Sequence, residues 1–167
     1  MNNRDDMTDE EIAEKVEEFL REYSYSVRYF INRRYSSETV RRISDHTLPR
    51  LCDPSAIVRA NACRILGDTH DPRACAPLIL RLMDEDTFVR KAACHALASV
   101  GDVTAVDPLL ARLHEEEPVY GAAWRTLLQL AETQSAIVEV LIEHSHNVDA
   151  IVRANACRIL GDTHDPR

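Results

Sequence analysis

The spacing of apolar residues in the middle of the chain predicts a pair of helices. Over residues 87–100 the apolar positions recur three and four residues apart, as they do on one face of an α-helix. These positions are Val89, Ala92, Ala93, Ala96 and Leu97. After Gly101-Asp102 a second amphipathic stretch follows, with Ala105, Val106, Leu109, Leu110 and Leu113. We therefore predict one helix on each side of the Gly101-Asp102 break.

This helix pair repeats with a period of 31 residues. When the sequence is shifted by 31 positions, Val58-Arg59 falls on Val89-Arg90 and Pro77-Leu78 falls on Pro108-Leu109. A regular period of this kind is typical of arrays in which each unit buries its apolar face against its neighbours. In the first unit we expect helices at about 55–66 and 72–83, with Asp71 capping the second. The units are predicted to span 53–83, 84–114 and, in a divergent form, 115–148.

The two ends of the chain depart from the regular unit. Residues 1–52 are predicted to form a helical cap, with a long helix over 8–34 that kinks around 24–26 and a second helix over 37–51. The long helix starts with the capping-box pattern Thr8-x-x-Glu11. Residues 149–167 form only half a unit. In the divergent unit Trp124 stands where the preceding unit has Ala93, and we expect a core residue that makes the curvature irregular.

The repeated motifs carry a family resemblance. Asp53-Pro54-x-x-x-Val58-Arg59-x-x-Ala62, with the alanine-rich helix and the Gly101-Asp102 turn of the next unit, resembles the phycobilisome-lyase subclass of HEAT-like repeats. The resemblance implies an all-α, armadillo-type fold. This is a right-handed α-solenoid of HEAT-like helix pairs, open-ended at its C-terminus. Repeats of this type occur in scaffolds, chaperone-like factors, bilin lyases and some enzymes, so the fold does not settle the function.

One family of enzymes with HEAT-like repeats has metal ligands whose positions can be checked in this sequence. Deoxyhypusine hydroxylases place His-Glu pairs directly after the Val-Arg signature, where they hold two irons. In this chain the same slots hold Ala60-Asn61, Lys91-Ala92 and Ala154-Asn155. The iron ligands are missing, so we reject this activity.

The composition and net charge of the chain exclude several classes of function. The chain has 167 residues and a net charge of −8, which argues against a nucleic-acid partner. No stretch approaches the ~18 apolar residues that a membrane span needs. The five cysteines form no C-x-x-C pair, which favours a reducing cytoplasm over a zinc site or a disulfide framework. Because no nucleophile–base pair, phosphate loop or dinucleotide motif is visible, we expect no enzymatic activity, no cofactor and no metal.

The segment 23–50 differs from the rest in its aromatic and basic content. It holds Tyr23, Tyr25, Tyr29 and Tyr35 together with Arg28, Arg33, Arg34, Arg41, Arg42 and Arg50. Such a mixture can bind single-stranded nucleic acid by phosphate contacts and stacking. The simpler interpretation is that these arginines neutralise the acidic residues of 1–22, while the tyrosines cover the core of the first unit.

An eighteen-residue stretch occurs twice without change. Residues 56–73 and 150–167 both read AIVRANACRILGDTHDPR, whereas 87–104 matches this stretch at only six of eighteen positions. Packing alone therefore does not enforce the identity, and the second copy is either a recent duplication or an artificial one. It leaves an uncovered helix at about 150–161. This helix either docks harmlessly or drives homo-oligomerisation through Ile151, Val152, Ile159 and Leu160.

The shift by 31 also aligns candidate binding residues near the ends of the second helices. Arg50, Arg81 and Arg112 fall in one row, with Glu143 next in line. The resemblance implies that second helices line the concave face, where such a row could grip an acidic protein or peptide. Alternatively, the arginines pair with Asp53, Asp84 and Glu115 and are structural. The same shift aligns two neighbouring rows, one of Ala76, Asp107 and Val138 and the other of Leu80, Ala111 and Ile142. These rows either form a binding groove beside the arginines or take part in ordinary packing between units.

The leading hypothesis from the sequence is a non-catalytic scaffold that binds a protein or peptide on its concave face. Two alternatives remain open. A bilin-lyase-like or assembly-chaperone role is implied only by the resemblance. The second alternative is a structural protein that self-associates through its uncapped C-terminal half repeat.

Overall fold

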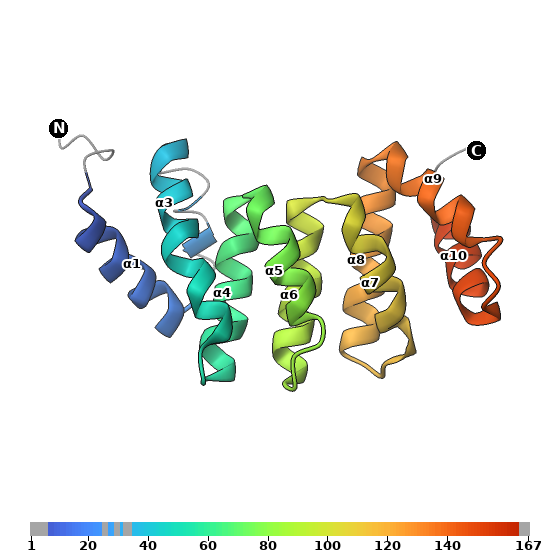
Figure 1. The fold of residues 1–167 in the computed structure, drawn as a ribbon, viewed down its shortest axis with the longest axis horizontal. Coiled ribbons are helices and arrows are strands. Elements are labelled where there is room, and N and C mark those ends of the chain that lie inside the picture. The colour runs from blue at the N-terminus through green and yellow to red at the C-terminus, as the bar shows by residue number, and fades with distance from the viewer. Residues whose placement is uncertain (1–6, 25–26, 29–30, 32–34, 164–167) are drawn as a thin grey trace.

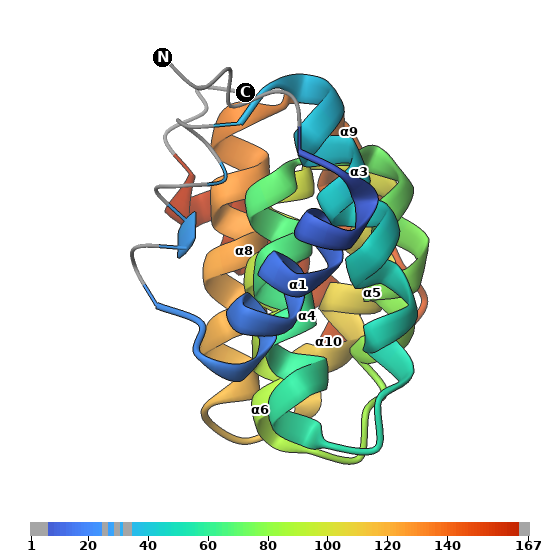
Figure 2. The same ribbon diagram turned by 90° about the vertical axis from the view of Figure 1, so that its left-hand side faces the viewer.

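The chain forms one row of stacked helix pairs in a computed structural model that describes residues 7–24, 27–28, 31 and 35–163 (Figure 1). Nine α-helices and no strands are present in these residues, as predicted for an all-α solenoid. Viewed along the row, the first helices α4, α6 and α8 lie on one side and the second helices α3, α5 and α9 on the other (Figure 2). No helix in the described part is both long enough and apolar enough to cross a membrane.

The N-terminal cap begins with α1 (Asp9–Arg21), whose predicted capping box is confirmed. The amide of Thr8 donates to Glu11 and the amide of Glu11 donates to the Thr8 hydroxyl. The predicted helix over 8–34 is wrong, because α1 ends at Arg21; residues 25–26, 29–30 and 32–34 of it lie outside the described residues. The side-chain amide of Asn61 donates to the Leu20 carbonyl at 2.8 Å, which satisfies one of the last carbonyls of α1 and ties its end to the next unit.

The second part of the cap also differs from its prediction. The helix expected over 37–51 is divided into α3 (Ser37–Thr47) and the 3₁₀ helix η1 (Leu48–Cys52). Pro49 lies in the first turn of η1, where it has no amide to donate to an α-helical bond, and this favours the change of helix type.

The two regular units have closely similar helices. The first contains α4 (Ala56–Thr69), η2 (Pro72–Ala74) and α5 (Cys75–Arg81), and the second contains α6 (Thr87–Val100), η3 (Val103–Ala105), α7 (Val106–Leu110) and η4 (Ala111–His114). Asp71 and Asp102 accept hydrogen bonds from the amides of Arg73 and Thr104 and so start the second helices. First helices end in a left-handed residue at equivalent positions, His70 (φ 52°) and Gly101 (φ 71°).

The first helices pack closely because small residues line their contact. Helix α4 runs through Gly67 to Thr69 rather than ending at the expected residue 66. A Cβ atom on Gly67 would lie 2.8 Å from Ala96 Cα, so only glycine permits this approach of α4 to α6. Leu66 and Leu97 are fully buried on either side of this contact.

The divergent unit contains α8 (Val119–Thr133) and α9 (Ser135–His144), and it is followed by the last helix, α10 (Ala150–Asp162). Trp124 is half-buried rather than fully enclosed, and its ring packs against the core. It stacks with Tyr120, and the Arg158 guanidinium lies 4.8 Å from the ring centre. The large ring therefore joins α8 to α10.

Candidate functional site

The second helices expose a row of apolar residues with one member in each unit. On α5 and in the turn that follows it, Ala76, Leu80 and Met83 face solvent, while Leu78 and Leu82 are buried. Side chains four and three residues apart on a helix share a face, so this exposure follows from the amphipathic pattern.

The row runs through Pro49, Leu80, Ala111 and Ile142, which are separated by 31 residues and are all exposed. Leu80 keeps 65% of its surface accessible and Ile142 keeps 38%. We call these four residues the apolar row. Pro49 and Met83 were not among the predicted residues, although the shift by 31 applied to Leu80 points to Pro49.

The three arginines beside the apolar row are engaged within the chain. Arg81 donates to the Leu51 carbonyl of the preceding unit at 2.9 Å and lies 3.5 Å from Asp84. Arg112 contacts the Leu82 carbonyl at 3.4 Å and pairs with Glu115 at 2.9 Å.

Arg50 bonds Glu17 at 2.6 Å and Asp53 at 3.2 Å. The Nε atoms of Arg50 and Arg112 are buried and have no hydrogen-bond partner in the described part of the chain. Each arginine thus links its unit to the preceding one.

Carboxylates dominate the exposed charge on the same face. Asp107 is exposed and accepts a contact from His144 Nε2 at 2.5 Å. Glu139 and Glu143 are exposed on α9. The charge that a partner would meet around Ala111 and Ile142 is therefore mainly negative.

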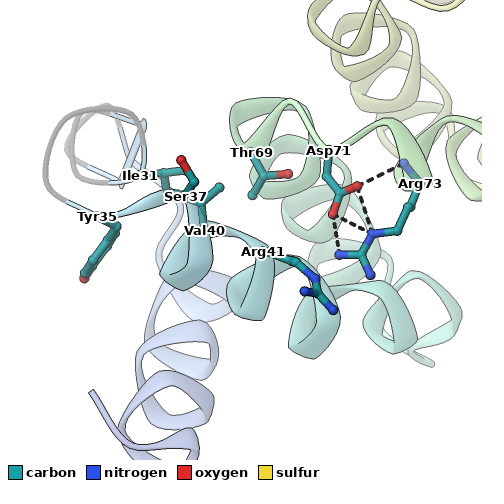
Figure 3. A pocket seen from close by; sticks show the side chains of 8 residues that line it. All are labelled: Ile31, Tyr35, Ser37, Val40, Arg41, Thr69, Asp71 and Arg73. Atoms are coloured by element: carbon teal, nitrogen blue, oxygen red, sulfur yellow. Dashed lines mark hydrogen bonds and ion pairs between the residues drawn. The ribbon is translucent and has the colours of Figure 1, made fainter. Parts of the chain in front are cut away.

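A pocket of about 380 Å³ lies between the cap and the turn after α4 (Figure 3). Arg41 and Arg73 are its cations. Asp71 and Asp45 hold Arg73 at 2.6 and 2.8 Å, and the hydrogen bond from Arg73 keeps the pKa of Asp71 below its usual value. Arg41 lies 3.8 Å from Glu38. The positive charges are thus compensated by neighbouring carboxylates, so this pocket is a weak candidate for binding anions.

The basic and aromatic residues of 23–50 make contacts with the acidic residues around them. Arg42 pairs with Asp9 at 2.5 Å. The Tyr23 hydroxyl donates to Asp68 at 2.5 Å, and Arg28 lies 3.5 Å from the same carboxylate. Tyr25, Tyr29, Arg33 and Arg34 lie outside the described residues.

The predicted self-association residues lie on different sides of α10. Ile151 is 52% exposed, and Val152 and Leu160 are half-buried. Ile159 is fully buried. Its side chain therefore belongs to the core of the last unit, and the exposed side of α10 is formed by other residues.

The described residues offer little for catalysis or metal binding. No three His, Cys, Asp or Glu side chains converge in them as a metal site would require. His144 contacts Asp107, whereas His146 contacts the Ile142 carbonyl, so the two histidines point to different partners. Burial raises the pKa of the Cys63 and Cys94 thiols to about 12, which keeps both protonated and unreactive.

Comparison with known proteins assigns the repeat type and the fold. A family model described as HEAT repeats matches residues 44–127. Among curated proteins, no sequence matches the chain. A designed armadillo repeat protein in complex with the peptide (KR)4 is similar in structure, with a TM-score of 0.56 and 16% identity over 91% of this chain and 81% of that one.

Two further solved structures share the fold. The complex of CpcE and CpcF of phycocyanin lyase from Nostoc sp. PCC7120 has a TM-score of 0.55 and 21% identity over 95% of this chain and 66% of that one. An engineered protein has a TM-score of 0.52 and 19% identity over 93% of this chain and 83% of that one. At these identities the likeness shows the fold alone.

Proposed function

Because the chain belongs to the HEAT repeat family, we propose that it is a non-catalytic scaffold that binds a protein or peptide along its second helices. The observation that carries this proposal is the apolar row, which places one exposed apolar residue in each of four successive units. Neighbouring helices pack about 8–10 Å apart. An amphipathic helix or an extended segment laid across the second helices could therefore contact several members of the row.

The charged contacts of the partner are expected to be basic. Arg50, Arg81 and Arg112 already bond carboxylates and carbonyls of this chain, so an acidic partner would have to displace them. Glu139 and Glu143 instead face solvent. The designed armadillo repeat protein with its (KR)4 peptide shows that a fold of this kind accommodates a basic peptide. We therefore propose a partner with apolar anchors and flanking Lys or Arg residues.

A displayed library of 16-residue peptides tests this function. Peptides selected on the natural chain are compared for affinity on Leu80→Glu and on Ile57→Glu. Both residues are exposed, at 65% and 70%, but Ile57 lies on a first helix, so its substitution is the matched control. We expect Leu80→Glu to weaken binding by about tenfold or more and Ile57→Glu to leave it unchanged. Selected peptides that bind both variants equally well would place the binding surface elsewhere.

A further inference from the structure

The outer side of the first helices carries cations that have no carboxylate partner. Most lysines and arginines of the described residues form an ion pair, as Arg42 does with Asp9. Arg64 of α4, Lys91 of α6 and Arg125 of α8 form none with any described residue. Because the chain has 28 acidic residues against 20 Lys and Arg, unpaired cations on three successive helices indicate a surface that is left free for an anion.

These three cations act on the same place, the exposed imidazole of His95 on α6. The pKa of His95 is held below its usual value by partial loss of water and, next, by the positive charges of Lys91, Arg125 and Arg64. The local field is therefore positive in a molecule whose net charge is negative. We call these four residues the basic cluster.

Two adjoining hollows between α4 and α6 give the basic cluster a shape. One, of about 200 Å³, lies at the N-terminal ends of the two helices and is lined by Ile57 and Phe88. The other, of about 110 Å³, lies further along the same helices and is lined by His95. Arg64 lines both hollows, so they form one channel that we call the outer groove.

The two ends of the outer groove differ in chemistry. Ile57 and Phe88 occupy equivalent positions, 31 residues apart, and keep 70% and 67% of their surface exposed. Two large apolar side chains that line one hollow form a patch whose burial by a partner stabilises a complex. The other end holds the basic cluster, so the outer groove joins an apolar site to a cationic one.

The carboxylates that line the outer groove are already engaged. Asp68 accepts a hydrogen bond from the Tyr23 hydroxyl and lies 3.5 Å from Arg28. Asp86 accepts the amide of Phe88 at the start of α6, at 2.8 Å. Their hydrogen-bonding capacity is thus used within the chain, whereas the cations of the basic cluster remain available to a partner.

The outer groove lies on the flank of the row and not at one of its ends. Helix α4 packs on α1 and α3, and α6 packs on α8, so both helices already have their neighbours along the row. The first helices form one side of the row and the second helices the other (Figure 2). Because units of such an array contact only the units before and after them, a further unit at either end would leave this flank exposed.

We propose that the outer groove binds an acidic peptide segment of a partner protein. One large apolar side chain of the segment lies between Ile57 and Phe88, and its carboxylates contact Arg64, Lys91 and Arg125. This surface is on the opposite side of the row from the second helices, and the proposal does not depend on binding there.

A single-stranded nucleic acid fits the outer groove less well than a peptide. Stacking needs an aromatic ring with a free face, but the Tyr23 ring is covered by the Arg64 guanidinium at 5.7 Å. Asp86 lies at the Phe88 end of the groove. A peptide can place an uncharged anchor there, whereas a nucleic acid carries a phosphate at every nucleotide and would be repelled.

The test uses a fluorescent twelve-residue peptide with two adjacent leucines followed by four glutamates. Its affinity for the full chain is measured by fluorescence anisotropy and compared with that of a peptide in which glutamines replace the glutamates. We expect the acidic peptide to bind about tenfold more tightly at low salt, and we expect this difference to shrink as salt screens the charges.

Charge reversal locates the binding site. Lys91→Glu and Arg125→Glu should each weaken binding of the acidic peptide by about tenfold, because each replaces an attraction by a repulsion. Arg41→Glu is the matched control, since it changes the net charge by the same amount on α3, and it should leave the affinity within about twofold. The acidic peptide should also raise the pKa of His95 in an NMR titration, with the His95 resonance assigned by its absence from His95→Gln.

Equal affinity for the two peptides overturns the proposal, as does a loss on Arg41→Glu as large as that on Lys91→Glu. An unchanged His95 pKa on binding overturns it too. Tighter binding of a twelve-nucleotide oligothymidylate would instead assign the groove to nucleic acid. A mass that rises with protein concentration and falls on Lys91→Glu would assign it to a second copy.

The two proposed surfaces are distinguished by one pair of variants. Ile57→Glu should weaken the acidic peptide by about tenfold and leave basic peptides on the second helices unaffected, whereas Leu80→Glu should do the reverse. Failure of one proposal therefore leaves the other standing.

Discussion

Replacing Gly67 and Gly161 with alanine isolates the packing energy of one helix contact. The two glycines occupy the same place in identical eighteen-residue segments, so the intrinsic preference of alanine for a helix is similar at both. That preference stabilises by up to about 1 kcal/mol. At Gly161 it should act almost alone, since the new methyl group enters open space. We therefore expect Gly161→Ala to stabilise α10 by about 0.5–1 kcal/mol.

At Gly67 the same methyl group meets the neighbouring backbone. Its Cβ would lie 2.8 Å from Ala96 Cα and 3.1 Å from Ala96 Cβ, whereas carbon atoms prefer about 3.5–4.0 Å. Helices α4 and α6 must separate, and overpacking of this kind costs about 1–3 kcal/mol. Because backbone atoms cannot rotate away, we take the upper part of that range. Gly67→Ala should then destabilise the protein by about 1–2 kcal/mol after the helix preference is subtracted.

Urea unfolding followed by circular dichroism measures the free energy of unfolding of the Gly67→Ala protein. Hydrogen exchange measures the local stability of α4 and of α10 separately in both variants. For a chain of this size, 1 kcal/mol corresponds to a shift in Tm of about 2–4 °C. A Gly67→Ala protein as stable as the natural one would refute the close approach of α4 and α6. Equal destabilisation by the two substitutions would refute the claim that α10 is open on this side.

Two further predictions concern the ion pair between Arg59 and Asp84. Arg59→Met should destabilise the protein by about 3 kcal/mol in urea unfolding, since the buried carboxylate of Asp84 loses its bidentate partner, whereas Arg153→Met should cost less than about 1 kcal/mol. Burial would raise the pKa of Asp84, but the hydrogen bonds from Arg59 and from the Asp86 amide outweigh it and hold that pKa below its usual value. The pair therefore contributes stability above about pH 4, the unfolded pKa of an aspartate, and loses it as the pH falls through the lower folded pKa. Asp84→Asn should consequently lose less stability than the natural chain between pH 5 and pH 2; equal slopes would contradict this assignment.

The sequence predicted the fold where the evidence was periodic. The 31-residue shift placed α6 and the helices that follow it, because a buried face repeats in every unit. The end of α1 at Arg21 could not be found in this way, since no periodic pattern marks it and the side chain that bonds the Leu20 carbonyl, Asn61, lies in the next unit. The sequence predicted that α4 ends at about residue 66, whereas the helix continues through Gly67 to Thr69. The left-handed residue is instead His70, which the same shift aligns with Gly101.

The candidate site was predicted in part. The shift found Leu80, Ala111 and Ile142, and it also found the arginines, but it could not show whether their guanidinium groups would face solvent or the preceding unit. Only the structure shows Arg81 bonded to the Leu51 carbonyl. The burial of Ile159 was similarly hidden, because α10 turns that side chain toward the row rather than toward its open end.

The links between first helices have a mechanical consequence. Arg59 reaches Asp84 in the next unit, and Arg90 reaches Glu115 in the one after, at 2.9 Å. The equivalent position in the divergent unit is Gly121, which has no side chain to reach α10 or its loop. Tension applied along the row will therefore meet the Arg59–Asp84 and Arg90–Glu115 ion pairs in its N-terminal half, whereas no arginine at the equivalent position of α8 reaches the loop before α10. Helix α10 should therefore separate from α8 at a lower force than the one that separates the first two units.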